Sequence, residues 1–238
     1  MEKTVCRIIS VLDHVLNGII ILISTVIILI SGYSLYDNAQ IHRNASDPSL
    51  LTYKPVMEGS GEKKGSVYLD RQAAWLTIEN SYIDFPVMQG NDNFEYLNKD
   101  PYGDFRISGS IYLDSNNAPD LSDEYSMIYG HHMDHYDMFG SLDLFASEAY
   151  FDAHREGWIQ TREKRYGFEL FAVVWGDAGD RVVFFPEGRT AAEVAAYIDD
   201  NAVINTGYEP GRRIVALSTC SGEKMSSRLI VFGMLSDS

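Results

Sequence analysis

The sequence is poor in cysteine and in basic side chains. Its two cysteines, Cys6 and Cys220, lie near opposite ends of a chain of 238 residues. Two thiols exclude a disulfide-stapled miniprotein and a cysteine-rich zinc module. With 19 Lys and Arg against 34 Asp and Glu, and a formal net charge of −15, the chain lacks the basic face with which nucleic-acid-binding proteins neutralise phosphates. We therefore expect no nucleic-acid partner.

The familiar motifs of metal and nucleotide sites are also missing. The sequence has no HExxH pattern, and no GxGxxG or P-loop follows a strand-like run. Histidine and aspartate side chains crowd into residues 131–137, but adjacent histidines seldom chelate one ion well. We expect neither a metal site nor a nucleotide site.

One long segment has no charged residue. It runs from Val15 to Tyr36, and as a helix its 22 residues would measure about 33 Å, enough to cross a hydrocarbon core of about 30 Å. A cleaved signal peptide is the alternative, but its apolar region is shorter, about 7–15 residues, and residues 32–36 form a poor cleavage site. We predict an uncleaved, single-pass anchor in the cell membrane. Because Lys3 and Arg7 precede it, the N-terminus should be cytoplasmic and the long C-terminal part extracellular.

The composition divides the chain into four parts. Residues 37–66 are polar and interrupted by proline and glycine, with room for a short helix, and we interpret them as a stalk. In this arrangement Cys6 and Cys220 lie on opposite sides of the membrane and cannot pair. Cys6 is then either an unreactive juxtamembrane residue or a lipidation site. The parts are a cytoplasmic N-terminus, the anchor, the stalk and an extracellular domain, at residues 1–14, 15–36, 37–66 and 67–238.

Short strand-like runs dominate the extracellular domain. They are bounded by Gly, Asn, Asp and Pro, a pattern typical of a barrel or sandwich. The best helix spans 190–200, where Thr190 and Glu193 can form a capping box, and shorter helical turns are expected at 92–97 and 138–146. The fold class is therefore mostly β with a few inserted helices. The expected strands are 74–78, 83–88, 110–114, 126–129, 167–175, 181–185, 214–219 and 229–235.

Cys220 is the candidate nucleophile. It ends an apolar strand before a flexible turn, where a side chain is held rigidly yet exposed; the alternative is a buried cysteine packed as a small hydrophobe. A nucleophilic thiol needs a base or an ion-pair partner, because a free thiol with a pKa of about 8.5 is mostly protonated at neutral pH. His131 also sits at a strand end, and in an extended backbone His132 would point away from it. His135 and His154 are interpreted as ordinary surface or core residues.

Arg228 opens the last strand, eight residues after Cys220. If the two strands form a hairpin, the guanidinium lies near the thiol, where it can hold a substrate carbonyl or a developing oxyanion. A solvated charge at a strand end is the alternative.

Several sequence blocks follow the anchor in a fixed order: 74–78, 83–90, 108–114, 129–133, 138–140 and 217–220, and then Arg228. This ordered set resembles the sortases, membrane-anchored cysteine transpeptidases of Gram-positive bacteria, and class B in particular. The resemblance implies an eight-stranded β-barrel with N-terminal helices and a helix inserted between strands six and seven. The predicted helix at 190–200 fits that insertion.

The resemblance also implies roles for three residues: Cys220 as nucleophile, His131 as general acid and base, and Arg228 for substrate orientation and oxyanion support. No metal or organic cofactor is required. The thiolate would cleave a C-terminal sorting motif in a secreted protein or pilin, and the thioacyl-enzyme would pass its acyl group to an amine of the cell-wall peptide or of a pilin lysine. The blocks at 88–91 and 131–133 are similar to a class B subgroup that polymerises pilins. Two alternatives remain: an extracellular cysteine peptidase, and a non-catalytic, membrane-anchored binding domain.

Overall fold

We analysed a computed structural model, which describes residues 2–45, 47–55, 67–177, 179–220 and 227–237. The chain forms two units, Met1–Arg43 and Asn44–Ser238, and each is described by itself.

The first unit is helical. Helix α1, Glu2–Ala45, includes the apolar segment Val5–Gln40, whose mean hydropathy reaches 2.5 and whose side chains are exposed. A helix satisfies all its backbone hydrogen bonds internally, which is what a hydrocarbon environment demands. The hydroxyl of Thr25 follows the same rule, since it donates to the carbonyl of Ile21 at 2.8 Å. The helix is long and apolar enough to serve as the predicted anchor.

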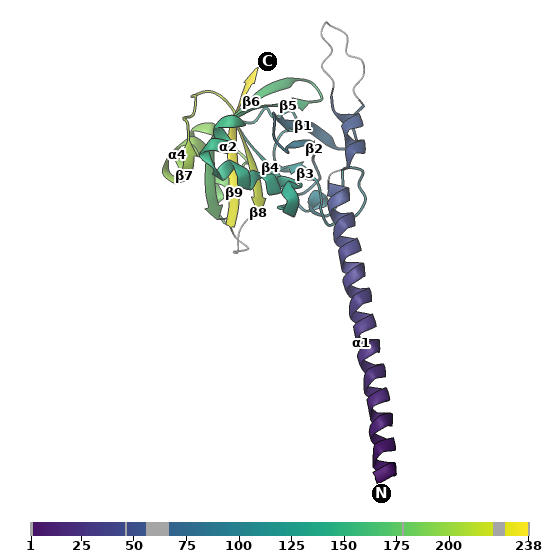
Figure 1. Cartoon of the computed structure of the whole chain (residues 1–238). Helices are drawn as coiled ribbons and strands as arrows, with labels where there is room; N and C mark the ends of the chain where they lie inside the picture. Colours follow the sequence, from purple (N-terminus) through teal and green to yellow (C-terminus); the bar gives the residue numbers. More distant parts are fainter. Residues whose placement is uncertain (1, 46, 56–66, 178, 221–226, 238) are drawn as a thin grey trace. The chain divides into compact units, whose positions relative to one another are not determined.

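The second unit is a closed β-barrel. Its strands are hydrogen-bonded in the order β5-β1-β2-β3-β4-β8-β9-β6, and a β5–β6 pairing closes the ring of eight, which confirms the predicted barrel (Figure 1). A short ninth strand, β7, pairs with the far half of β6. The strands are β1 (Gln72–Ile78), β2 (Asp84–Met88), β3 (Ile111–Leu113), β4 (Tyr125–Gly130), β5 (Glu156–Thr161), β6 (Arg165–Asp177), β7 (Ala202–Asn205), β8 (Ile214–Cys220) and β9 (Ser227–Asp237).

Strand β8 is apolar on both faces because it separates two cores. Val215 and Leu217 join the cluster that fills the barrel, to which all eight ring strands contribute. Ile214 and Ala216 belong to a second cluster on the outer face, beneath helix α4. A strand buried on both faces has no polar alternation, which explains its continuous apolar run.

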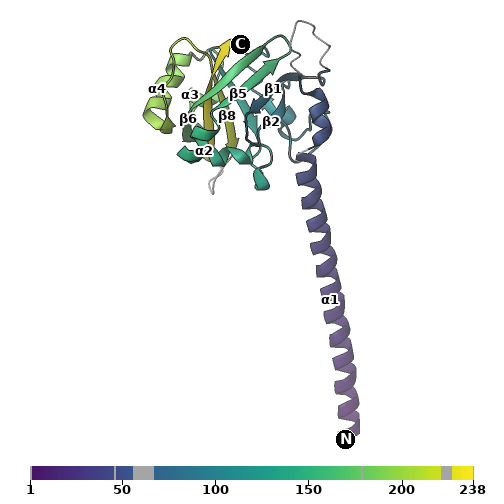
Figure 2. The same ribbon diagram turned by 45° about the horizontal axis from the view of Figure 1, so that its top comes forward.

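Helix α4, Ala191–Asn201, confirms the helix predicted between strands six and seven. Thr190 and Glu193 form the expected capping box: the Thr190 hydroxyl accepts from the Glu193 amide, and the Glu193 carboxylate accepts from the Thr190 amide. Val194 and Ile198 are fully buried on the face that covers the outer cluster. The helix lies on the outside of the barrel in both views (Figure 1 and Figure 2).

One predicted strand is wrong. Residues 181–185 are not extended but begin with a short helix, α3 (Arg181–Phe184). Asp180 caps this helix by accepting the Val182 amide at 3.0 Å, and the buried Val183 packs in the outer cluster. A capped turn therefore overrode the β preference of two adjacent valines. The prediction also missed β5, whose sequence mixes Glu, Gly and Gln, and β7, which follows α4 without a turn.

The folded unit starts earlier than composition suggests. It includes Asn44 and a short 3-10 helix, η1 (Pro48–Tyr53), and the buried Leu50 of this helix packs in a cluster with Trp75. Residues 44, 45 and 47–55 of the predicted stalk therefore lie in the compact unit. Residues 56–66 of that stalk lie outside the described part of the chain.

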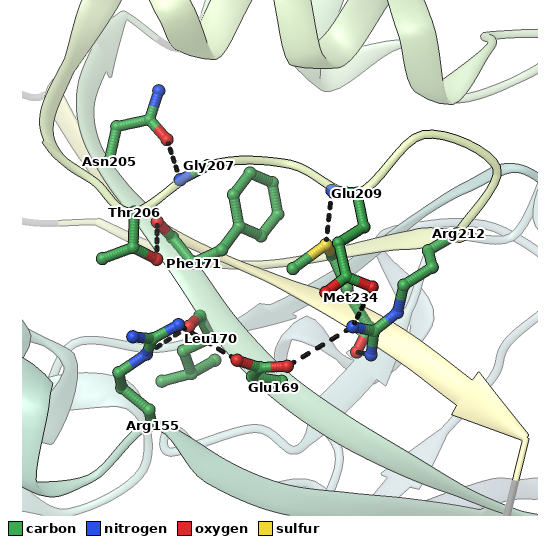
Figure 3. Close-up of polar contacts among 10 residues, drawn as sticks. All are labelled: Arg155, Glu169, Leu170, Phe171, Asn205, Thr206, Gly207, Glu209, Arg212 and Met234. Atoms are coloured by element: carbon green, nitrogen blue, oxygen red, sulfur yellow. Dashed lines mark hydrogen bonds and ion pairs between the residues drawn. The ribbon is translucent and has the colours of Figure 1, made fainter.

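An ionic network fixes the entry to β8 (Figure 3). Glu169 of β6 binds Arg155 at 3.0 Å and Arg212 at 3.3 Å. Arg212 also donates to the backbone carbonyls of Met234 and Leu235 on β9. One guanidinium fork thus joins the loop before β8 to two neighbouring strands.

A β-bulge in β6 also holds the loop before β8 by hydrogen bonds. The β6–β9 register shifts between Leu170 and Ala172, so Phe171 is the extra residue. Its carbonyl accepts hydrogen bonds from both the amide and the hydroxyl of Thr206, just after β7 (Figure 3). The chain is therefore fixed at two points before it enters β8.

Candidate active site

Three neighbouring strands, β4, β8 and β9, bring the predicted site residues to one rim of the barrel. Gly130 pairs with Thr219 in the parallel β4–β8 ladder, so His131 and Cys220 are each the next residue along. Cys220 in turn is the direct antiparallel partner of Arg228. Backbone register alone places these residues together, as strand spacing of about 4.8 Å requires. The side chain of Cys220 and residues 221–226 lie outside the described part of the chain.

His131 is anchored by the connection between β2 and β3. Its Nε2 lies 2.7 Å from the carbonyl oxygen of Leu97, at the end of the 3-10 helix η2 (Glu95–Leu97). A carbonyl oxygen can only accept, so Nε2 carries the hydrogen and Nδ1 is the nitrogen left for proton transfer. Gly109, at φ +59°, packs against both groups, and a Cβ there would collide with the Leu97 carbonyl.

The other histidines of the barrel unit have separate partners. His132 is directed elsewhere, because its Nε2 lies 2.8 Å from the carboxylate of Asp143 in the 3-10 helix η4 (Phe139–Ala146). His135 is exposed, in the short helix η3 (Asp134–Tyr136). His154, which follows helix α2 (Glu148–Ala153), bonds and stacks against Tyr150. His131 is thus the histidine that directly follows the β4 residue paired with β8.

Arg228 occupies the start of β9, between two strands. Its backbone pairs with Cys220 of β8 on one side and with Gly176 of β6 on the other. The residue is half-buried. A guanidinium on the strand beside the thiol is suitably placed to bind a carbonyl oxygen.

A buried polar network beneath the rim was not predicted. Asp114 is only 1% exposed, and its carboxylate accepts from Asn93 at 2.8 Å, from Tyr129 at 2.9 Å and from the Asn116 amide at 2.9 Å. Burial raises the pKa of the Tyr129 hydroxyl far above its ordinary value, and the neighbouring Asp114 carboxylate raises it further, so Tyr129 remains a donor. The network ties the β2–β3 connection to β4, two residues before His131. Asn93 lies in the helical turn expected at 92–97, and Asp114 ends the strand expected at 110–114, but no local pattern shows that the two residues meet.

Within the described part of the chain, no group of three or more His, Cys, Asp or Glu side chains is arranged to hold a metal ion. The rim instead offers a sulfur nucleophile position, an imidazole and a guanidinium. These are the components of acyl transfer through a thioester.

A closed β-barrel with cysteine, histidine and arginine positions at one rim suits a cysteine acyltransferase or peptidase. Comparison with known proteins then identifies the family: the sortase domain matches residues 76–236, so the chain belongs to the sortase family. It is 29% identical to Sortase B of Listeria monocytogenes over 167 residues, 68% of each chain.

Solved structures place the protein in class B. A Streptococcus pyogenes class B sortase involved in pilus biogenesis is 32% identical, with a TM-score of 0.64, over 82% of this chain and 100% of that one. Sortase B from the type II pilus of Streptococcus pneumoniae is 30% identical, with a TM-score of 0.59, over 71% of this chain and 94% of that one. The protein is therefore a class B sortase, a cysteine transpeptidase, as the sequence predicted.

Proposed function

We propose that this sortase polymerises pilins, with Cys220 as nucleophile, His131 as general acid and base, and Arg228 as the group that orients the substrate. The observation that supports these roles is the register of β4, β8 and β9, which aligns the three positions on adjacent strands. A secreted protein or pilin with a C-terminal sorting motif is the acyl donor.

In the first half-reaction, the Cys220 thiolate attacks the backbone carbonyl carbon of the sorting motif. Arg228 stabilises the negative charge that develops on the carbonyl oxygen. The C–N bond breaks, the leaving amine takes a proton from the His131 imidazolium, and a thioester remains on Cys220. The hydrogen bond from Nε2 to Leu97 leaves Nδ1 to supply that proton.

In the second half-reaction, an incoming amine attacks the thioester carbonyl. His131 takes the proton that the amine loses, the C–S bond breaks, and the thiolate is regenerated with a new amide bond. The proposed amine is the side chain of a pilin lysine. Two pilus-associated relatives at 30% and 32% identity favour this acceptor over the cell-wall peptide.

The long apolar helix α1 supplies the membrane attachment. We place residues 1–14 in the cytoplasm and the barrel outside, because Lys3 and Arg7 precede the apolar run. This orientation puts the barrel on the side where secreted substrates emerge.

The test uses the full chain in detergent micelles with a library of sorting-motif peptides. Mass spectrometry should show a thioacyl adduct on Cys220 and, with hydroxylamine or an amine present, a transfer product. Cys220→Ala should give neither, whereas the matched variant Cys6→Ala should retain full activity. If no peptide gives an adduct or product, the transpeptidase proposal fails. If Cys220→Ala stays active, the site assignment fails.

The same assay separates the alternatives. A cysteine peptidase would release the acid even when amine is abundant, and a binding domain would retain peptides without cleaving them. Adding a chelator should leave turnover unchanged, since the proposed chemistry uses no metal. Acceptors that carry lysine should compete with glycine peptides for the acyl group if pilins are the substrate.

A further inference from the structure

The connection between β2 and β3 carries an exposed aromatic groove. Phe94 is 78% exposed and Phe105 is 73% exposed, the two highest values for a large apolar side chain among the described residues of the barrel unit. Tyr102 and Ile107, on the same connection, are also exposed. Both phenylalanines line an open cavity of about 610 Å³ together with Asn98 and Lys99. A concentration of exposed apolar side chains on one connection marks an interaction surface.

The groove is held in place by hydrogen bonds. Asp92 accepts from the Phe94 amide at 2.9 Å, and Asn93 is tied to the buried Asp114. Further along, the Arg106 amide donates to the Asn98 carbonyl at 3.0 Å. The two rings are therefore presented by an ordered loop, which lowers the entropy cost of binding.

The groove lies beside the proposed proton-transfer residue. Asn98 and Lys99, which line it, directly follow Leu97, whose carbonyl lies 2.7 Å from His131 Nε2. In the second half-reaction His131 receives the proton of the incoming amine. A lysine in a segment bound in the groove would therefore lie close to His131 and to the thioester on Cys220.

The charge of the connection complements a basic segment. Residues 89–110 contain four carboxylates and two cationic side chains, on a chain whose net charge is −15. Asp104, next to Phe105, is exposed, and within the described part of the chain its carboxylate forms no hydrogen bond or ion pair. A lysine side chain, with an apolar stem and an ammonium group, matches aromatic rings beside the exposed carboxylate of Asp104.

From these features we infer that the groove between Phe94 and Phe105 docks the acceptor protein through the apolar residues that flank its reactive lysine. The inference rests on the proposed function and specifies the partner of its second half-reaction. The groove selects the acceptor and takes no part in cleavage of the donor.

The test separates the two half-reactions. The double variant Phe94→Ser/Phe105→Ser and the control Val203→Ser, at an exposed apolar position on β7, are assayed as full chains in micelles. Two acceptor peptides are used, one with lysine flanked by valine and tyrosine, the other with lysine flanked by glycine and serine. The double variant should raise the KM for the apolar-flanked peptide about tenfold or more, while kcat and transfer to hydroxylamine remain unchanged. The control should behave as wild type.

The other possible results contradict either the docking inference or the proposed function. An unchanged KM in the double variant overturns the inference but not the proposed function. If wild type forms no thioacyl-enzyme, the proposed function fails; titration of the same peptides into Cys220→Ala, with and without the two serine substitutions, then decides the docking inference alone. Membrane insertion of the loop would also overturn it. That would appear in nanodiscs of brominated lipid as stronger fluorescence quenching of Phe94→Trp than of Val203→Trp.

Discussion

Gly130 and Thr219 are direct partners in the parallel β4–β8 ladder, although 89 positions separate them in the chain. Each is followed by a residue to which we assign a chemical role. A parallel pair cannot be closed by a tight turn, so the chain makes a long excursion through β5, β6 and α4 before it returns. The arrangement yields expectations for individual residues.

His131 and His132 should differ sharply in their contribution to catalysis. His131→Ala should lower kcat/KM by about 10²–10⁴, the usual contribution of a general acid and base. His132→Ala removes only an exposed contact with Asp143 and should stay within about threefold of wild type. Steady-state kinetics with a fluorogenic peptide measures both. If His132→Ala lost more activity than His131→Ala, the assignment of proton transfer to His131 would be wrong.

Arg228 should require a guanidinium and not merely a positive charge. We expect Arg228→Ala to reduce kcat/KM by about 10²–10³, because a donor to the developing oxyanion is lost. Arg228→Lys should restore only part of this loss, since a point charge lacks the planar fork. Full activity in either variant would contradict oxyanion support. Thermal melting of both proteins checks that the barrel remains folded.

Tyr129 should stabilise the fold through the buried carboxylate of Asp114. Tyr129→Phe removes one donor to that carboxylate and should lower the free energy of unfolding by about 1–3 kcal/mol. Tyr82→Phe, at a position that is 57% exposed, should change it by less than about 0.5 kcal/mol. Urea denaturation of the two variants gives the comparison. Equal effects would show that the buried network adds little.

Glu95 should make the β2–β3 connection sensitive to acid. The backbone hydrogen bond from Asn91 and the nearby Lys99 hold the pKa of Glu95 below its ordinary value near 4.5. A carboxylate with a lowered folded-state pKa stabilises the fold above its unfolded pKa, and this contribution is lost as the pH falls through the folded value. Unfolding midpoints of wild type and Glu95→Gln should therefore converge as the pH falls below the ordinary carboxyl pKa near 4.5. The exposed control Glu187→Gln should track wild type throughout; a constant gap for Glu95→Gln would reject this role.

Local sequence patterns predicted most of the barrel but not its closure. Apolar runs such as 214–219 fall on β8 because strand periodicity and flanking turns are local properties. The capping box at Thr190 likewise follows from two residues three positions apart. By contrast, the 181–185 run was misread because Asp180 caps a helical turn there.

In the candidate site, too, local sequence predicts the strand ends but not the contacts between distant segments. Strand ends at His131, Cys220 and Arg228 can be found by inspection, and the sortase blocks single out these residues. The meeting of Asn93, Asp114 and Tyr129 cannot be found that way, because it joins three separate segments. The hydrogen bond between His131 and the Leu97 carbonyl also joins distant segments of the chain. The sequence therefore could not predict which ring nitrogen of His131 carries the hydrogen.

The β4–β8 pairing also sets the order in which activity can arise during biosynthesis. β4 leaves the ribosome long before β8 and β9, and pairings between distant segments form slowly because a long loop must close first. The rim that carries His131 gains its cysteine and arginine neighbours only when the last two strands are in place. In a nascent chain the three proposed site positions therefore come together only when β8 has paired with both β4 and β9.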